Sequence, residues 1–261
     1  MKKHRKTLSA LMCAVMLIIA CFGGVSSAYA EENDDVNGDL SLEEGAEVYY
    51  RSAEEMALLQ AKIDAANLHM LSHYSGSDLT DSLIFQEVTL SVPRYAQETG
   101  YYCGPATVKE IIHYFNGSSQ TQAQYAATLG TTTNGTSMSV IPGVLTNAIG
   151  SDMNQYYYDD TWTTFSQWAT RIMTAIDEGN PVVVDVNASA GYTSIPYTGN
   201  GHYLAVIGYI YNKQTHTLTD VKVADPSTAC NSYYTSQGYL WYTASDLFNA
   251  NAAHWRKAII W

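Results

Sequence analysis

The sequence predicts an α+β fold, with a helical part that precedes an antiparallel β-sheet along the chain. Helical periodicity dominates the segments between residues 52 and 176, and short apolar strands dominate the residues from 181 onward. No internal repeat occurs, and strands do not alternate regularly with helices as they do in a parallel βαβ sheet. These observations favour a helical lobe packed on an antiparallel sheet.

The first 30 residues have the pattern of a secretory signal peptide. Four basic residues within Lys2–Lys6 precede an apolar run from Leu8 to Ala20, and Ala28-Tyr29-Ala30 supplies the small residues of a cleavage site. The apolar run is too short for a membrane span. We therefore expect a secreted, extracellular protein. As an alternative, Cys21 ends a lipoprotein-like box and would carry a lipid anchor in the membrane.

Residues 31–84 are predicted to form an acidic N-terminal segment. Residues 31–92 hold 14 acidic and 2 basic residues, and the whole chain has a net charge of −12. Without a cluster of basic residues, a nucleic-acid partner is not expected. Ser52 and Glu55 have the spacing of a helix capping box, and apolar residues at helical intervals follow as far as Gly76. This helix either packs on the domain or belongs to a pro-segment that inhibits the site from within the chain.

The remaining elements follow one another over residues 85–261, which we expect to form one domain. The sequence predicts the following elements: strands over 85–92, 181–186, 203–211, 218–224 and 257–261, and helices over 103–116, 121–129, 137–149 and 165–176. The strand from Tyr203 to Tyr211 is apolar on both faces, which indicates a central strand.

Cys103 is the candidate nucleophile. Pro105 is tolerated only in the first turn of a helix, so Cys103 lies at the helix entrance, where unpaired amides favour a thiolate. Gly104 is expected to leave space beside the sulfur for a substrate carbonyl. A buried structural cysteine, or a disulfide with Cys230, would explain the residue without catalysis.

A nucleophilic thiol needs a base, and His202 is the best-placed histidine. It follows the turn Gly199-Asn200-Gly201 and opens the central strand. His113 lies ten residues along the same helix as Cys103, about 15 Å away at 1.5 Å per residue, and is too far. His254 has neighbours typical of an ordinary surface.

A base of this kind is oriented by an acceptor on its second nitrogen. Asp225 ends the strand 218–224, and a hairpin with the strand 203–211 would bring it beside His202. Asp185 is the rival acceptor, although on its apolar strand we expect it to face solvent. An oxyanion also needs donors, and Gln97 could supply its side-chain amide together with the Cys103 backbone amide.

Three stretches carry a family resemblance: VPRYAQETGYYCGPATV, GHYLAVIGY and VKVADP. They resemble motifs of the bacteriocin-processing (double-glycine leader) peptidases, which are papain-like cysteine peptidases, over residues 85–261. The resemblance implies Cys103 as nucleophile, His202 as general base and acid, Asp225 as orienting acid and Gln97 as oxyanion-hole donor. The family's best-known members are domains of export transporters, so cleavage after a double glycine is not assumed for a chain with a signal peptide.

The leading hypothesis is a secreted cysteine peptidase that acts on a peptide or protein through a thioester. A second hypothesis uses the same site on peptides of the cell wall, as an amidase, endopeptidase or transpeptidase, with cell-wall association. A third is an inactive binding module with a Cys103–Cys230 disulfide. No cofactor or metal is expected: His69 and His73 have helical spacing but no glutamate between them, and we interpret them as a solvated face.

Overall fold

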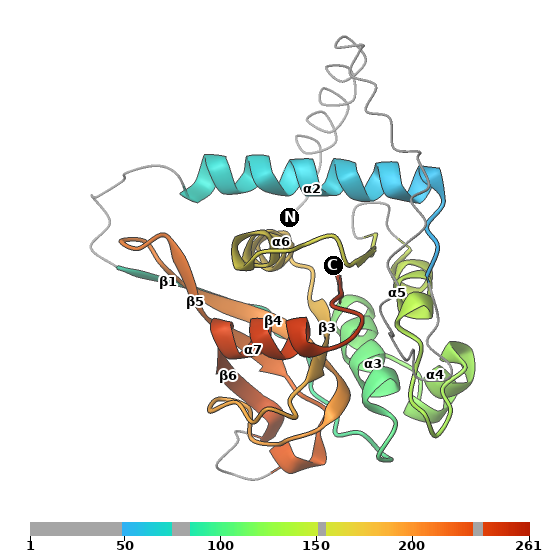
Figure 1. Cartoon of the computed structure of the whole chain (residues 1–261). Coiled ribbons are helices and arrows are strands. Elements are labelled where there is room, and N and C mark those ends of the chain that lie inside the picture. The colour runs from blue at the N-terminus through green and yellow to red at the C-terminus, as the bar shows by residue number, and fades with distance from the viewer. Residues whose placement is uncertain (1–48, 75–83, 151–154, 232–236) are drawn as a thin grey trace, which may run out of the picture. The chain divides into compact units, whose positions relative to one another are not determined.

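A computed structural model describes residues 49–74, 84–150, 155–231 and 237–261. The chain divides into two compact units, Met1–Ala46 and Glu47–Trp261. The first unit lies outside the described residues, and with it the expected signal peptide and the alternative anchor at Cys21. The second unit has the predicted α+β fold (Figure 1).

The predicted helices are present with small changes in their ends. The helices are α2 (Ala53–Tyr74), α3 (Cys103–Asn116), α4 (Gln122–Leu129), α5 (Ile141–Ile149), α6 (Phe165–Asp177) and α7 (Ala244–Ala253). Ser52 begins α2 as expected, since its hydroxyl accepts from the amide of Glu55 at 3.1 Å. Gly117 ends α3 in the left-handed conformation. Helix α7 was not predicted. No helix within the described ranges is both long and apolar enough to cross a membrane.

One antiparallel sheet forms the centre of the domain. Its strands are β1 (Phe85–Thr89), β2 (Tyr158–Asp159), β3 (Val182–Asn187), β4 (Asn200–Asn212), β5 (Thr217–Ala224), β6 (Tyr239–Thr243) and β7 (Ile259–Ile260). The order is β2-β7-β3-β4-β5-β6, with β1 also paired to β4. The prediction of a central β4 is confirmed, because β3 and β1 flank one side of it and β5 the other. The sequence did not predict β2 or β6.

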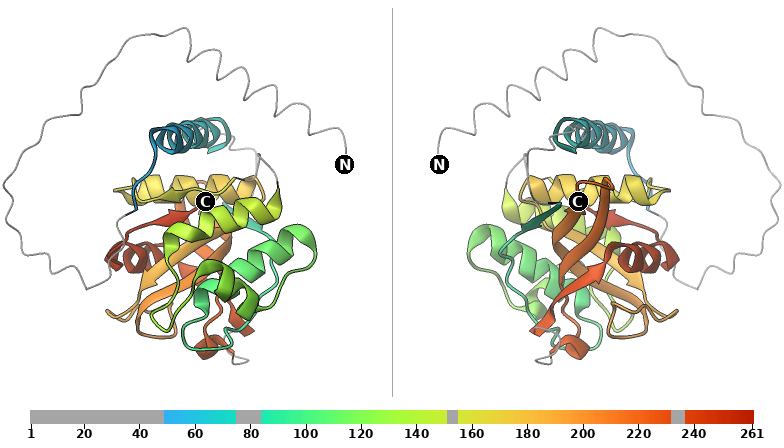
Figure 2. Two further views of the ribbon diagram at one scale, coloured as in Figure 1. Left: turned by 90° about the vertical axis from the view of Figure 1, so that its right-hand side faces the viewer. Right: turned by 90° about the vertical axis from the view of Figure 1, so that its left-hand side faces the viewer.

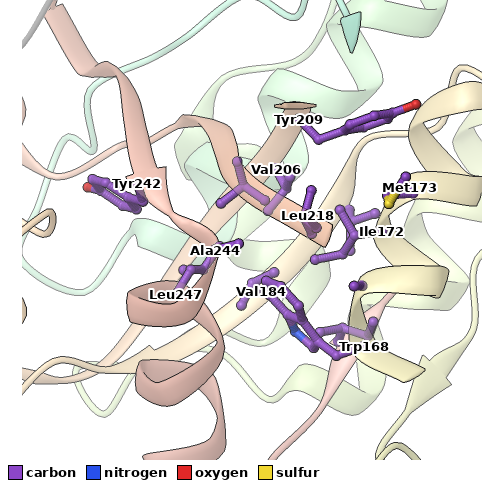
Figure 3. Packing of buried hydrophobic residues seen from close by; sticks show 14 of the residues in the cluster. Trp168, Ile172, Met173, Val184, Val206, Tyr209, Leu218, Tyr242, Ala244 and Leu247 are labelled. Carbon is purple, nitrogen blue, oxygen red and sulfur yellow. The ribbon is translucent and has the colours of Figure 1, made fainter. Parts of the chain in front are cut away.

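Helices cover both faces of the sheet (Figure 2). On one face, Val184 and Val206 pack against Trp168 and Ile172 of α6 and Leu247 of α7, as Figure 3 shows. On the other face, alternate strand residues pack against α3 and α5, with Ile111, Leu145, Val183 and Ala205 all fully buried. The alternation follows from the two-residue period of a strand, and it seats α3 firmly against β4.

Helix α2 packs on α6 (Figure 1). The Asp177 carboxylate at the end of α6 joins the two helices: it accepts from His69 at 2.8 Å and from Tyr74 at 2.6 Å. The interpretation of His69 and His73 as a solvated face is wrong for His69. This side chain is half-buried and bonds to Asp177. Tyr209 of β4 donates to the same carboxylate at 2.5 Å, so α2 is tied to the sheet as well.

Candidate active site

Cys103 is the first residue of α3, and its side chain is 7% exposed. The preceding residue, Tyr102, caps the helix without a side-chain hydrogen bond. The first amides of α3 therefore have no capping side chain from the N-cap residue, and they present partial positive charge to the region around the thiol. The predicted placement of Cys103 at a helix entrance is confirmed.

Gly104 has a different structural role from the one expected. A Cβ atom at this position would lie 2.5 Å from the Thr136 hydroxyl oxygen and 2.8 Å from its Cβ. The space beside Gly104 is filled by Thr136 and is not open to a substrate. The glycine lets α3 approach the loop that carries Thr136, so its role is packing.

His202 lies near the start of β4, and its Nε2 atom is 2.8 Å from Asp225 Oδ1. Burial would lower the pKa of His202. The negative charge and hydrogen bond of Asp225, with a smaller contribution from the Cys103 thiol, outweigh burial and raise the pKa from 6.5 to about 10. Because Asp225 occupies Nε2, the contact with Cys103 falls to Nδ1. His202 is therefore charged at neutral pH.

Asp225 receives four hydrogen bonds. Oδ1 accepts from His202 and from the amide of Ser227 at 2.8 Å, and Oδ2 accepts from the hydroxyls of Tyr197 and Tyr242, each at 2.8 Å. Burial favours the neutral acid, but the charge of His202 and these donors prevail and lower the pKa of Asp225. The β4–β5 hairpin that was expected to bring Asp225 to His202 is present.

Gln97 lies on the segment that leads into α3. Its backbone amide donates to the Pro226 carbonyl at 2.8 Å, next to Asp225, and its side-chain amide donates to the Thr99 carbonyl at 2.8 Å. One N–H of the side-chain amide is thus bound locally, and within the described residues the other has no hydrogen-bond partner. The structure brings Gln97 to the turn that carries Asp225.

Arg94 fixes the same turn, although sequence reasoning missed it. Its guanidinium donates to the carbonyls of Asp225 at 2.7 Å and Ser227 at 2.8 Å. Gly238 allows this approach, because a Cβ there would lie 2.2 Å from Arg94 Nε. The only signal in the sequence was the position of Arg94, three residues before Gln97.

Glu110 is a second missed residue near the site. It is fully buried on α3, where its Oε1 accepts from the amide of Tyr95 at 2.7 Å and its Oε2 has no hydrogen-bond partner among the described residues. Burial raises the pKa of Glu110 well above its usual range, which favours the neutral form of the carboxyl. A glutamate on the apolar face of a predicted helix was the available signal.

The two rival residues form a separate cluster. Asp185 is 1% exposed and His254 is 2% exposed, and their Oδ2 and Nε2 atoms are 3.5 Å apart. Arg256 donates to the same carboxylate at 3.1 Å. The expectations that His254 lies on an ordinary surface and that Asp185 faces solvent are therefore wrong. His113 donates to or accepts from the Tyr95 hydroxyl at 2.5 Å and does not join the site.

Cys230 forms no disulfide with Cys103, and both cysteines are buried. The disulfide that the binding-module hypothesis requires is not formed. Burial and the negative charge of Asp225 raise the pKa of the Cys230 thiol to about 12. Within the described part of the chain, no three His, Cys, Asp or Glu side chains come together in a group that could hold a metal ion.

A cysteine at a helix N-terminus beside a histidine–aspartate pair is the arrangement of a cysteine-type hydrolase, and a helix packed on an antiparallel sheet is its papain-like form. Residues 89–257 match the model of the Peptidase_C39-like family. The chain belongs to this family, and it is a cysteine peptidase.

Two solved structures are similar to the chain. One is a double glycine motif protease from an AMS/PCAT transporter in complex with the leader peptide, with 11% identity and a TM-score of 0.41 over 66% of this chain and 91% of that one. The other is the peptidase domain of Streptococcus ComA, a bi-functional ABC transporter involved in a quorum sensing pathway, with 16% identity and a TM-score of 0.40 over 64% and 95%. The search of curated proteins found no match.

Proposed function

We propose that the protein hydrolyses peptide bonds of a peptide or protein substrate, with Cys103 as nucleophile, His202 as general base and acid, and Asp225 as orienting acid. The observation that carries the proposal is the 2.8 Å contact between His202 and Asp225 beside the Cys103 thiol. A histidine held charged at neutral pH favours a thiolate next to it, and the thiolate is the attacking form of cysteine.

The chemistry follows from these positions. The Cys103 sulfur attacks the carbonyl carbon, a C–S bond forms, and the carbonyl oxygen becomes an oxyanion. The C–N bond then breaks as His202 gives its Nδ1 proton to the leaving amine, which leaves a thioester. Water attacks the thioester while neutral His202 takes a proton from the water, and the C–S bond breaks to release the acid and the Cys103 thiolate beside the charged His202.

Gln97 is proposed as the oxyanion-hole donor, together with the Cys103 backbone amide. The Gln97 amide needs one N–H for the Thr99 carbonyl and keeps the other for a substrate oxygen. Donors of this kind act without reorganisation when their geometry is fixed beforehand, and the backbone bond from Gln97 to Pro226 provides that fixation.

Reaction with iodoacetamide tests the site without knowledge of the substrate. Cys103, located by mass spectrometry of labelled peptides, should react at neutral pH in the wild-type protein, and the reaction should slow steeply in His202→Ala. An unreactive Cys103 in reduced protein at neutral pH would overturn the proposal. Product analysis with unstructured peptides and with peptidoglycan then separates the peptidase from the cell-wall amidase, endopeptidase or transpeptidase.

We also propose that the protein is secreted after removal of residues 1–30; lipid attachment at Cys21 is the alternative. The basic start, apolar run and small-residue cleavage site support secretion. Sequencing the N-terminus of the protein from culture medium should read Glu31 first. A start between Glu31 and Phe85 that appears with time would instead indicate removal of the acidic segment.

Inhibition by residues 31–84 stays a prediction, and α2 offers no direct support for it. Within the described residues, α2 makes hydrogen bonds to Gln155, Asp177 and Tyr209, and to Tyr49 and Ser52 just before the helix. None of these goes to Cys103, His202 or Asp225. An inhibitory contact would have to come from the parts of 31–84 outside the described residues.

A further inference from the structure

We infer that Tyr197 is a positioning residue of the proposed catalytic site, which holds Asp225 through its hydroxyl and covers the His202–Asp225 bond with its ring. This inference rests on the proposed function. Tyr197 lies in the connection between β3 and β4, its hydroxyl is 2.8 Å from Asp225 Oδ2, and its ring lies edge-on to the His202 ring with centroids 5.2 Å apart.

Both oxygens of the Asp225 carboxylate accept hydrogen bonds. Tyr197 and Tyr242 both donate to Oδ2, so this oxygen is saturated and Oδ1 alone remains for His202. The carboxylate cannot rotate without breaking two hydrogen bonds. The His202 ring is consequently held in the orientation that points Nδ1 at Cys103.

The two tyrosines that donate to Asp225 differ in burial and in their neighbours. Tyr242 is fully buried in the core cluster on the α6 and α7 face, where it is part of the packing. Tyr197 is only partly buried, and it is the one that contacts the His202 ring. Tyr197 therefore separates the His202–Asp225 bond from solvent, and a charge interaction kept from water is stronger than an exposed one.

Hydrogen bonds and packing fix the connection between β3 and β4, and so hold Tyr197 in place. Asp246 at the start of α7 accepts from the amide and hydroxyl of Ser194 at 2.9 and 2.8 Å, and Ile195 is 4% exposed in the core. The amide of Ala188 donates to the Gly199 carbonyl at 2.7 Å and closes the base of the connection. The ring is thus placed by bonds on both sides of it.

Three variants of the full chain separate positioning from general loosening. Tyr197→Ala removes the donor and the cover, Tyr197→Phe removes the donor alone, and Tyr192→Ala perturbs the same connection at a residue that packs on the core but is not a partner of Asp225. The measurement is the rate of Cys103 alkylation as a function of pH. The change in this rate at the highest pH, called the upper transition, reports loss of the His202 proton. The ionisable groups around the pair are Cys103, Glu110, Arg94, Tyr197, Tyr242 and Cys230.

We expect the upper transition to move down by about one pH unit in Tyr197→Ala, since water weakens the hold of Asp225 on the imidazolium, and by less in Tyr197→Phe. With a peptide substrate, Tyr197→Phe should lower kcat by about 3- to 10-fold with KM little changed. An unmoved transition in Tyr197→Ala, or an equal shift in Tyr192→Ala, would overturn the inference. If the alkylation rate of the wild-type protein shows one transition only, like that of a free thiol, the proposed function itself is overturned.

Discussion

The backbone amide of Gln97 donates to the carbonyl of Pro226 at a distance of 2.8 Å. This bond joins the segment that leads into α3 to the turn that carries Asp225. Arg94 adds two side-chain bonds to the same turn. One short segment therefore aligns the helix that carries Cys103 with the strand end that carries Asp225. This alignment does not depend on contacts between the side chains of the site.

Gln97→Ala should lower kcat by about 100-fold with little change in KM, because an oxyanion donor acts in the transition state and not on the bound substrate. The backbone bond to Pro226 survives the substitution, so the site should stay aligned. Gln120→Ala, at an exposed glutamine, is the control. A Gln97→Ala enzyme with kcat within twofold of wild type would rule out the donor role.

Asp225→Asn should lower kcat by about 10- to 100-fold without unfolding the protein. The asparagine has one stable orientation: its oxygen must face His202 and the Ser227 amide, because that amide can only donate, and its NH₂ must face the tyrosine hydroxyls, which can turn to accept. His202 then keeps its orientation but loses the attraction of a negative charge. The upper transition of Cys103 alkylation should fall toward the ordinary histidine range, and an unchanged transition would contradict this account.

The pH dependence of stability should report the His202–Asp225 pair. The pKa of His202 is raised from 6.5 to about 10, so its contribution is fully present below pH 6.5 and is lost as the pH rises through 10. In a Cys103→Ala background, which removes the thiol as a second titrating group, we expect a loss on the order of 2 kcal/mol between these pH values. Urea unfolding of Cys103→Ala and of Cys103→Ala/His202→Gln would measure it, and parallel curves for the two proteins would refute the prediction.

Gly104→Ala should destabilise the protein by about 1–3 kcal/mol, since the added methyl group meets Thr136 at 2.5 Å. Gly100→Ala is a matched control in the same segment, because nothing lies within 4 Å of a Cβ there. Thr136→Gly should partly rescue Gly104→Ala in thermal melts. Equal melting temperatures for the two alanine variants would show that α3 shifts to make room.

Asp177→Asn should loosen α2 while leaving the site intact. The carboxylate accepts from His69, Tyr74 and Tyr209, and its conversion to an amide removes the charge and sets an NH₂ group against one of the donors. We expect a destabilisation of about 1–3 kcal/mol and faster hydrogen exchange across α2. Asp64→Asn, at an exposed residue whose carboxylate accepts from Gln60 within α2, is the control. Unchanged exchange in α2 would show that apolar packing alone holds the helix.

Much of the fold could be predicted from the sequence because local signals agree with tertiary structure. Gly117 ends α3 where Asn116-Gly117 predicted an end, and β4 is the central strand that its two apolar faces indicated. The hairpin geometry placed Asp225 beside His202 because adjacent antiparallel strands bring one end to the other's beginning. The two residues of β2 are too few for a period to show, and the sequence Tyr239–Thr243 of β6 has no alternation of apolar and polar residues.

The residues around the site could not be predicted in the same way, because long-range packing decides them. Asp185 and His254 looked like surface residues from their neighbours, and each is buried by the other together with Arg256. Tyr197 and Tyr242 are two of the chain's 21 tyrosines, and only the folded chain shows which hydroxyls meet Asp225. Glu110 lies on the apolar face of α3, and only the folded chain shows that it accepts from the amide of Tyr95.

Strand β4 connects two separate regions of the domain, with His202 at one end and Tyr209, bound to Asp177 beneath α2, toward the other. Tyr209 lies seven residues along the strand from His202, about 23 Å at 3.3 Å per residue. While the chain is intact, α2 meets α6 at a high effective concentration. A single cut between Tyr74 and Phe85 would make the same contact an association of two chains, so the melting temperature of the cut protein would fall on dilution while that of the intact protein would not.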